Sequence, residues 1–366
     1  SQLGNDIDGE AANDYSGWSV SLDSDGDRVA IGAYSYDGTG PDAGHVRIYS
    51  WDGSSWSQLG SDINGEAAYD YSGYSVSLDS DGDRVAIGAT RNDGTGSNAG
   101  HTRIYSWDGS SWSQLGSDID GEAAGDQSGY SVSLDSDGDR VAIGATQNAG
   151  NGTQAGHTRI YSWDGSSWSQ LGSDIDGEAA NDYSGTSVSL DSDGDRVAIG
   201  ANWNGGNGSR AGHVRIYSWD GSSWNQLGSD IDGEAAIDYS GTSVSLDSNG
   251  DRVAIGAQDN DGSFSNAGHV RVYNAFSVKI SGTAGFRMLS APVSNGTYTD
   301  LLSELWTQGM TGSDAAEASG DNVWTWTVGS GGAGSWSVAT NLGATMTAGA
   351  GILVYAFADN LSLIHI

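Results

Sequence analysis

The chain has 366 residues, of which 36% are hydrophobic and 14 are Trp, so it can bury a large core and does not have the composition of a disordered protein. A formal net charge of −34 with only 14 basic residues disfavours nucleic acid and anionic membrane surfaces as partners. The absence of cysteine excludes disulfides, thiolate catalysis and cysteine-based zinc sites, and no apolar run is long enough to cross a bilayer, so membrane insertion is not expected.

A unit of 56 residues repeats through the first part of the chain. Ser1–Trp56 returns three times with few changes, and a fifth copy begins at Asn225 and fades after Asn274. Repeats of this period indicate stacked units that share one continuous core, because a single unit cannot bury its apolar faces alone. Positions that differ between copies are therefore the first place to look for function.

Each copy is predicted to contain four antiparallel strands, and the first two form a hairpin. In the first copy, Ser19–Leu22 and Arg28–Ile31 alternate small or polar residues with apolar ones, and Asp25–Gly26 lies halfway between them. Asp-Gly is a preferred sequence for a two-residue type I′ turn, and this register places Asp23 opposite Arg28. We expect an exposed cross-strand ion pair there, worth roughly a few tenths of a kcal/mol.

The third strand is predicted at His45–Trp51 and the fourth at Trp56–Ile63, joined by a turn at Asp52–Ser55. Trp51 and Trp56 flank this turn, so they are expected to pair across the two strands. Four antiparallel strands in each copy are typical of a propeller blade, which predicts an all-β fold.

The two ends of the repeat array are out of phase. The chain opens on a fourth strand at Ser1–Ile7, whereas the last copy lacks this strand. Ser1–Ile7 can therefore complete the last blade and close a five-bladed ring, which would leave no free sheet edge. If further copies precede Ser1, five is a lower limit.

Three segments are expected along the chain. Residues 1–274 form the repeat domain. Residues 275–360 form a β-rich module that occurs once, with a helix near Tyr298–Trp306. Residues 361–366 (LSLIHI) are expected to be a non-native tail.

Three segments of the third copy carry a family resemblance: Gly125–Val132, Arg140–Ala145 and Gly156–Tyr161. They resemble the FG-GAP repeat of integrin-α-type β-propellers, and similar series of repeats occur in bacterial surface proteins. The resemblance implies a secreted or cell-surface adhesion protein with a propeller fold, in which five copies are all or part of the ring and seven blades are one possible full number. Calcium-binding members carry an Asp-rich loop between the first two strands, and Asp23–Arg28 departs from its pattern.

A second group of acidic residues recurs in the connection from the fourth strand to the next first strand: Asp6, Asp8, Glu10 and Asp14. Oxygen ligands at alternating positions can hold calcium. The alternative is that Asp8 and Gly9 turn the chain while Asp14 caps backbone amides. Calcium is the one cofactor that the sequence suggests.

One histidine begins the third strand of every copy: His45, His101, His157, His213 and His269. These residues are spread around the ring, so we expect each imidazole to be structural and bonded to the backbone of a neighbouring blade. No nucleophile with a paired base and no unique acid–base pair emerges, so the sequence does not predict an enzyme.

The turns between the first two strands and between the last two are nearly invariant, and both are expected on one rim of the disc. The other rim holds most of the variation, in the loops after the second strands and in the connections between copies. Aromatic residues there are expected to surround the mouth of the central channel and to bind a ligand. These candidate ligand-binding residues are Trp18, Tyr74, Tyr130, Tyr15, Tyr71, Tyr183, Tyr239 and Trp203.

The leading hypothesis is a non-enzymatic propeller, extracellular or on a bacterial cell surface, that binds a protein or carbohydrate through the variable rim. One alternative is a structural spacer whose repeats bind nothing specific. Another is a propeller glycosidase or lyase, which would need a unique pair of carboxyl groups in the channel. The sequence does not indicate the oligomeric state.

Overall fold

The computed structural model describes residues 2–262 and 264–275, together with the backbone of four strands in the last part of the chain. Contacts divide the chain into two units, Ser1–Ala275 and Phe276–Ile366. The described residues contain strands and turns but no helix, so the fold is all-β, as predicted. The helix expected at Tyr298–Trp306 and the tail at 361–366 lie outside the described residues.

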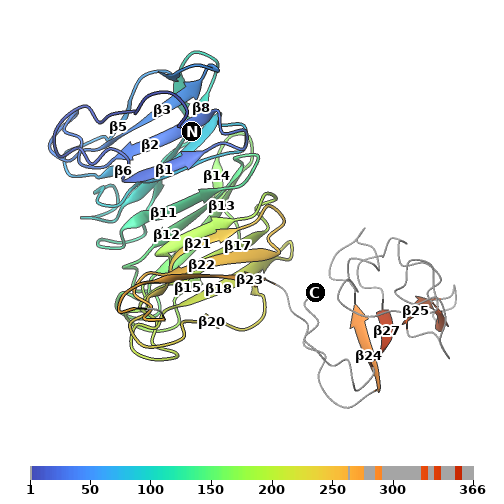
Figure 1. Ribbon diagram of the computed structural model, residues 1–366. Coiled ribbons are helices and arrows are strands. Elements are labelled where there is room, and N and C mark those ends of the chain that lie inside the picture. The colour runs from blue at the N-terminus through green and yellow to red at the C-terminus, as the bar shows by residue number, and fades with distance from the viewer. Residues whose placement is uncertain are drawn as a thin grey trace. The chain divides into compact units, whose positions relative to one another are not determined.

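Each repeat forms one antiparallel sheet, which we call a blade and number 1 to 5 along the chain (Figure 1). The first strands are β1 (Ser19–Leu22), β6 (Ser72–Leu78), β11 (Ser128–Leu134), β16 (Ser187–Leu190) and β21 (Ser240–Leu246). The second strands are β2 (Arg28–Ala33), β7 (Arg84–Ala89), β12 (Arg140–Ala145), β17 (Arg196–Ala201) and β22 (Arg252–Ala257). The third strands are β3 (His45–Trp51), β8 (His101–Trp107), β13 (His157–Trp163), β18 (His213–Trp219) and β23 (His269–Asn274).

The fourth strand forms as predicted but in two pieces, each paired with a different part of the third strand. The first pieces are β4 (Trp56–Gln58), β9 (Trp112–Gln114), β14 (Trp168–Gln170) and β19 (Trp224–Gln226). The second pieces are β5 (Ile63–Asn64), β10 (Ile119–Asp120), β15 (Ile175–Asp176) and β20 (Ile231–Asp232). Trp51 lies opposite Trp56 with the ring centroids 5.4 Å apart, which confirms the predicted aromatic pair.

The first hairpin has the register that its turn predicts. Val20 lies opposite Ile31 and Leu22 lies opposite Val29. The predicted two-residue type I′ turn is wrong, because such a turn needs a positive φ at both central residues and only Gly26, at 70°, has one. The Gly26 N–H donates to the Asp23 carbonyl at 3.3 Å, so the turn runs from Asp23 to Gly26. Short-range turn chemistry therefore sets which side chains of β1 and β2 face the core.

Asp23 and Arg28 do not form the exposed ion pair predicted for them, and each has another hydrogen-bond partner. Asp23 is buried, and its Oδ1 accepts a hydrogen bond from the backbone N–H of Arg28 at 3.0 Å. The guanidinium of Arg28 donates to the carbonyl of Gly82 in blade 2, also at 3.0 Å. The prediction was wrong because the acid satisfies a buried backbone donor, while the arginine joins two blades.

The core of the repeat unit lies between successive blades. Val46 and Ile48 of blade 1 pack against Val76 and Leu78 of blade 2, and all four are buried. Equivalent residues form the same cluster at the next two junctions. Because each junction repeats the same contacts, each blade is rotated about the axis by a similar amount relative to its neighbour.

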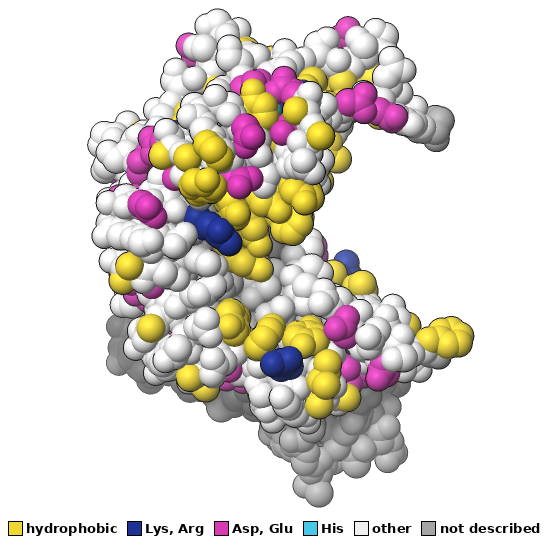
Figure 2. Space-filling view, turned by 90° about the vertical axis from the view of Figure 1, so that its left-hand side faces the viewer, with side chains coloured by type: hydrophobic (Ala, Val, Ile, Leu, Met, Phe, Trp, Pro, Cys, Tyr) yellow, Lys and Arg dark blue, Asp and Glu magenta, His cyan; other side chains and the backbone are white. Residues whose placement is uncertain are grey.

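The five blades form an open arc, and Figure 2 shows the gap between its two ends. At one end, Val20 and Leu22 are 64% and 59% exposed, and at the other, Val270 and Val272 are 69% and 67% exposed. Residues at the equivalent positions inside the arc are buried. Five similar rotations do not complete a turn, so the two apolar end faces do not meet.

The predicted closure of a five-bladed ring by Ser1–Ile7 is therefore wrong. Among the described strands, β23 pairs with β22 alone. The opening segment packs on blade 1 instead, where the carbonyl of Leu3 accepts a hydrogen bond from the Trp56 indole at 3.1 Å. Leu59 makes the same contact with Trp112 at 2.9 Å, so the opening segment lies against blade 1 as each outer strand lies against the next blade.

The second unit contains one antiparallel sheet among its described residues. Its strands follow the order β24 (Gly285–Ser290), β27 (Gly351–Ala356), β25 (Val323–Val328) and β26 (Gly334–Val338). The chain returns to the middle of the sheet with its last strand, so this sheet is not another copy of the blade.

Candidate functional site: the variable rim

Because the strands of each blade are antiparallel, the loops after the second strands and the connections entering the first strands lie at the same edge. We call this edge the variable rim. Figure 2 shows it face-on, with hydrophobic side chains gathered along the inner edge of the arc and basic side chains beside them. The hollow that this inner edge surrounds is the mouth of the central channel.

Tyr34 is the centre of an aromatic cluster on blades 1 and 2. Its ring centroid lies 5.4 Å from that of Tyr15 and 5.0 Å from that of Trp18. The rings of Tyr71 and Tyr74 lie 5.1 Å and 5.8 Å from it. Four of these five residues were predicted as ligand-binding from the sequence, and the structure brings them together through Tyr34, which was not.

The aromatic row continues into blade 3 and resumes on blades 4 and 5. Tyr130 lies 5.1 Å from Tyr74 and extends the first cluster around the mouth. On blades 4 and 5, Trp203 lies 4.9 Å from Tyr183 and 6.2 Å from Tyr239. The eight predicted residues thus fall into two groups.

Two arginines of the rim stack on these aromatic groups. The guanidinium carbon of Arg91 lies 4.3 Å from the ring centroid of Tyr71. That of Arg210 lies 4.1 Å from the ring of Trp203, and its Nη1 donates to the Tyr239 hydroxyl at 3.2 Å. Sequence reasoning missed both arginines and Tyr34, although each stands at a position that varies between copies, and that variation was the available signal.

The tyrosines beside the mouth occupy a strained backbone conformation. Tyr15, Tyr71, Tyr183 and Tyr239 have φ between 52° and 59°, and Gln127 has a φ of 56° at the equivalent position. Bulky residues rarely adopt this left-handed region, which glycine enters without strain. Strain of this kind is concentrated at functional sites, so the rim keeps large side chains where the backbone alone would favour glycine.

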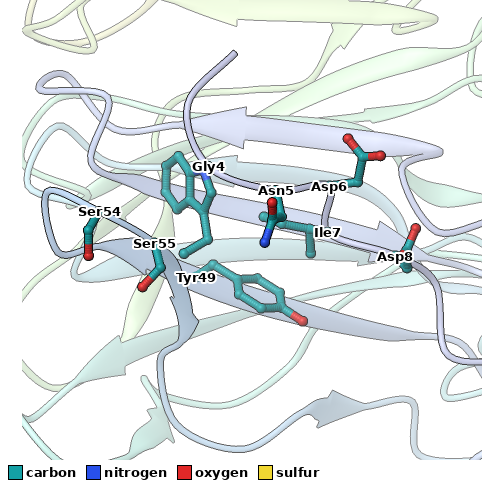
Figure 3. Close-up of a pocket in the computed structure, with 9 residues that line it drawn as sticks. Gly4, Asn5, Asp6, Ile7, Asp8, Tyr49, Ser54 and Ser55 are labelled. Atoms are coloured by element: carbon teal, nitrogen blue, oxygen red, sulfur yellow. The ribbon is translucent and has the colours of Figure 1, made fainter.

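The acidic residues predicted as a calcium site are divided among different contacts. Asp14 is buried, and its Oδ2 accepts a hydrogen bond from the Ala11 N–H at 2.7 Å, as the capping alternative requires. Figure 3 shows the carboxylates of Asp6 and Asp8 separated along a cleft of about 270 Å³, with Tyr49 beside them. These three positions do not share one centre.

Glu10, the fourth of these acids, lies beside the histidine of blade 1. Its Oε2 is 3.9 Å from Nδ1 of His45, and Oδ2 of Asp62 is 3.8 Å from the same nitrogen. The backbone hydrogen bond predicted for the imidazoles is not made by His101 or His157, whose ring nitrogens lack hydrogen-bond partners within the described residues. The histidines face carboxylates instead.

The Asp-rich turn between the first two strands does not fit the calcium loop of the family that the sequence resembles. In blade 2, Asp79 is buried and its Oδ1 accepts a hydrogen bond from the Arg84 N–H at 3.0 Å. Burial, with a smaller contribution from the nearby Asp83 carboxylate, raises the pKa of Asp79 to about 6. Calcium prefers about six to eight oxygen ligands, whereas this turn brings two carboxyl groups together around a backbone amide.

Asp79→Asn is expected to stabilise the repeat unit at pH 8 by about 1 kcal/mol. The unfolded chain ionises this carboxyl near its ordinary pKa of 3.8 and the folded chain near 6, so a rise in pH between these values opposes folding. Since the amide cannot ionise, its advantage should be full at pH 8 and absent below about pH 4. Urea unfolding at both pH values measures the difference.

Asp81→Asn is the matched control, because Asp81 is an exposed residue of the same turn and its change removes the same formal charge. We expect it to alter the unfolding free energy far less than Asp79→Asn does. An Asp79→Asn variant that is less stable than the wild type at pH 8 would contradict the raised pKa.

Antiparallel four-stranded blades placed around an axis, with a variable rim at the channel mouth, define a repeat protein of the β-propeller class. The sequence profile of the FG-GAP repeat matches residues 7–49 and 64–105, which lie in the first two copies. The chain therefore contains FG-GAP repeats, which confirms the resemblance found in its sequence. No helix in the described part of the chain has the length and apolarity needed to span a bilayer.

Solved structures that are similar to this chain include Kuenenia stuttgartiensis hydrazine synthase, with 13% identity over 70% of each chain and a TM-score of 0.45. Another is a Bacteroides uniformis ATCC 8492 protein proposed as a 6-phosphogluconolactonase, with 10% identity, a TM-score of 0.42, and coverage of 70% of this chain and 80% of that one. These likenesses are too distant to bear on function. No curated protein matches the chain.

Proposed function

We propose that the repeat unit is a non-enzymatic recognition module that binds a protein or carbohydrate on its variable rim. The observation that carries this proposal is the continuous row of aromatic rings from Tyr15 through Tyr34 and Tyr74 to Tyr130. Aromatic side chains give large apolar contact areas at a small loss of conformational freedom, and tyrosine adds a hydroxyl for hydrogen bonding.

The backbone strain at Tyr15, Tyr71, Tyr183 and Tyr239 supports the same proposal. A side chain that only filled space could be replaced by glycine with a gain in stability. Retention of tyrosine at four of the five equivalent positions indicates that the ring itself has a use. The guanidinium groups of Arg91 and Arg210 add positive charge to the rim of an otherwise acidic protein, so an acidic group on the ligand would find a partner there.

A structural spacer is the second candidate, and the near-identity of the invariant rim favours it. It predicts that the aromatic rim binds nothing and that changes there matter only for stability. Catalysis is not part of the proposal, because nearly identical blades offer repeated groups where an enzyme needs one asymmetric set. Family members are typical of the cell exterior, so we place the protein outside the cell or on a bacterial surface.

Tyr71→Gly separates recognition from structure. Glycine fits a φ of 59° without strain, so this variant should unfold at the same urea concentration as the wild type or a higher one. If the rim binds a ligand, the same variant should lose binding about tenfold, because a ring that contacts Tyr34 and Arg91 is removed. Binding of the full chain is measured on glycan arrays and on intact cells.

Trp18→Ala and Leu22→Ala form a matched pair at the two ends of β1. Trp18 immediately precedes β1 on the variable rim and is 52% exposed, whereas Leu22 is the last residue of β1 and is 59% exposed. The first change should weaken binding about tenfold and the second should leave it unchanged. Full binding by both Tyr71→Gly and Trp18→Ala would leave the spacer as the better account.

A further inference from the structure

A cluster of one histidine and two carboxylates recurs in four blades. In blade 2, Nδ1 of His101 lies 4.0 Å from Oε2 of Glu66 and 3.7 Å from Oδ2 of Asp118. The histidine begins β8, the aspartate lies between β9 and β10, and the glutamate belongs to the connection that enters the blade. The clusters are Glu10–His45–Asp62, Glu66–His101–Asp118, Glu122–His157–Asp174 and Glu178–His213–Asp230, each with its three nearest atoms within 4.8 Å of one another.

Each carboxylate is oriented by a neighbour that holds its other oxygen. Gln114 donates from Nε2 to Oδ1 of Asp118 at 2.6 Å, so Oδ2 is the oxygen that faces the imidazole. Nη1 of Arg103 lies 3.5 Å from Oε1 of Glu66. The other oxygen of Glu66, Oε2, therefore faces the imidazole of His101. The same glutamine contact recurs in the other three blades, at 2.6 Å or 2.7 Å. Partners of this kind fix the ligands of metal sites in proteins.

The imidazole at the centre is buried and has no hydrogen bond. His101 is 1% exposed, and its Nδ1 has no partner within the described residues. The 3.7 Å and 4.0 Å separations from the two carboxylate oxygens are too long for hydrogen bonds. A neutral imidazole has one ring nitrogen with a free lone pair, and Nδ1 of His101 is the nitrogen that faces both carboxylates.

We propose that each of the four clusters binds one divalent transition-metal ion of the Zn²⁺ type, with Nδ1 of the histidine and one oxygen from each carboxylate as ligands. Ligand atoms bound to tetrahedral zinc lie about 3.4 Å apart, since each bond is about 2.0 to 2.2 Å long. Each carboxylate oxygen therefore needs to move toward Nδ1 by only a few tenths of an ångström, and Glu66, which is 46% exposed, has room for this movement. The two negative charges match the charge of the ion.

The donor set selects against calcium. Calcium takes about six to eight oxygen ligands, whereas an imidazole nitrogen with two carboxylate oxygens and an open fourth position suits zinc, cobalt or nickel. Blade 5 has an incomplete cluster and serves as an internal control. Oε2 of Glu234 lies 3.7 Å from Nδ1 of His269, but the described part of this blade has no fourth strand and therefore no residue equivalent to Asp118. The expected stoichiometry is therefore four ions per chain and not five.

The test uses the full chain freed of metal with a chelator and titrated with Co²⁺ in buffer that contains excess Ca²⁺ and Mg²⁺. We expect about four tightly bound Co²⁺ ions per chain, a visible absorption band typical of low-coordinate cobalt, and displacement by Zn²⁺. His101→Gln should reduce the number to about three, and His269→Gln should leave it at four. Asp118→Asn should cause the same loss as His101→Gln, which covers the case in which the buried histidine is needed for folding.

Two results would overturn the proposal. One is a stoichiometry that stays the same in both His101→Gln and Asp118→Asn, because the ions would then be bound elsewhere on the acidic surface. The other is loss of all Co²⁺ binding in excess Ca²⁺ and Mg²⁺, because general attraction to a chain of net charge −34 would explain that. Neither result depends on whether the variable rim binds a ligand.

Discussion

Gly100→Ala should lower the free energy of unfolding of the repeat unit by about 3 kcal/mol or more. Gly100 has a φ of 73°, and a Cβ placed on it would collide with the backbone carbonyl and N–H of Ser128. This contact is the parallel bridge by which blade 2 meets the start of β11, and Ser128 also donates from its N–H to the carbonyl of Ala99 at 2.9 Å. Backbone on both sides leaves no flexible group to move away.

Gly109→Ala is the control that measures the cost of a positive φ without the steric collision expected in Gly100→Ala. Gly109 has a φ of 94° in the exposed turn between β8 and β9, and a Cβ there would meet no atom within 4 Å. Its replacement should cost about 1 kcal/mol, from conformation alone. Urea unfolding followed by tryptophan fluorescence measures both variants, and equal losses would show that the bridge between blades contributes little to stability.

The strands and their pairing could be predicted because they depend on neighbours in the sequence. The register centred on Asp25–Gly26 is the one observed, although the turn itself is closed between Asp23 and Gly26 and is not of type I′. Trp51 and Trp56 pair across a turn of four residues for the same reason. The departure at Asp23, which caps a backbone amide, shows the limit of this reasoning: a cross-strand position does not reveal which partner a side chain will choose.

The open arc could not be predicted, since closure depends on the sum of five rotations. Each rotation is set by how Val46 and Ile48 pack against Val76 and Leu78, which is a matter of side-chain shape. The strand phase correctly indicated that the last blade has no fourth strand among the described residues, but it carried no information about the angle between blades. The opening segment kept its usual neighbour, Trp56, and did not reach β23.

For the candidate sites as well, the sequence indicated individual residues, whereas only the fold shows which residues lie together. Variation between copies pointed to Trp18, Tyr71 and Tyr74, yet only the fold shows that Tyr34 joins them. The predicted calcium ligands, Asp6, Asp8, Glu10 and Asp14, had been grouped because they are close in the sequence. Pairing of β5 with the start of β3 instead brings Asp62 next to His45, and Glu10 reaches the same nitrogen from the preceding connection.

One more copy of the repeat placed before Ser1 should raise the free energy of unfolding by about 3 kcal/mol. A copy of Ser113–Trp168 keeps the phase, because its final Trp168 then precedes Ser1 as Trp56 precedes Ser57. The added blade should cover Val20 and Leu22, which are 64% and 59% exposed at the free end. The equivalent Val76 and Leu78 are 8% and 6% exposed where blade 1 covers them.

A second version of the added copy, carrying Ile160→Asn, is the control. Ile160 is the residue that packs against the next blade in the third copy, where it contacts the cluster containing Val188 and Leu190. An amide buried at this junction without a partner should remove most of the gain, although the added length and charge are the same. If both versions stabilise the protein equally, or neither does, the free face of blade 1 is not completed by another blade. A gain confined to the unaltered copy would show that the apolar face of blade 1 is a blade interface.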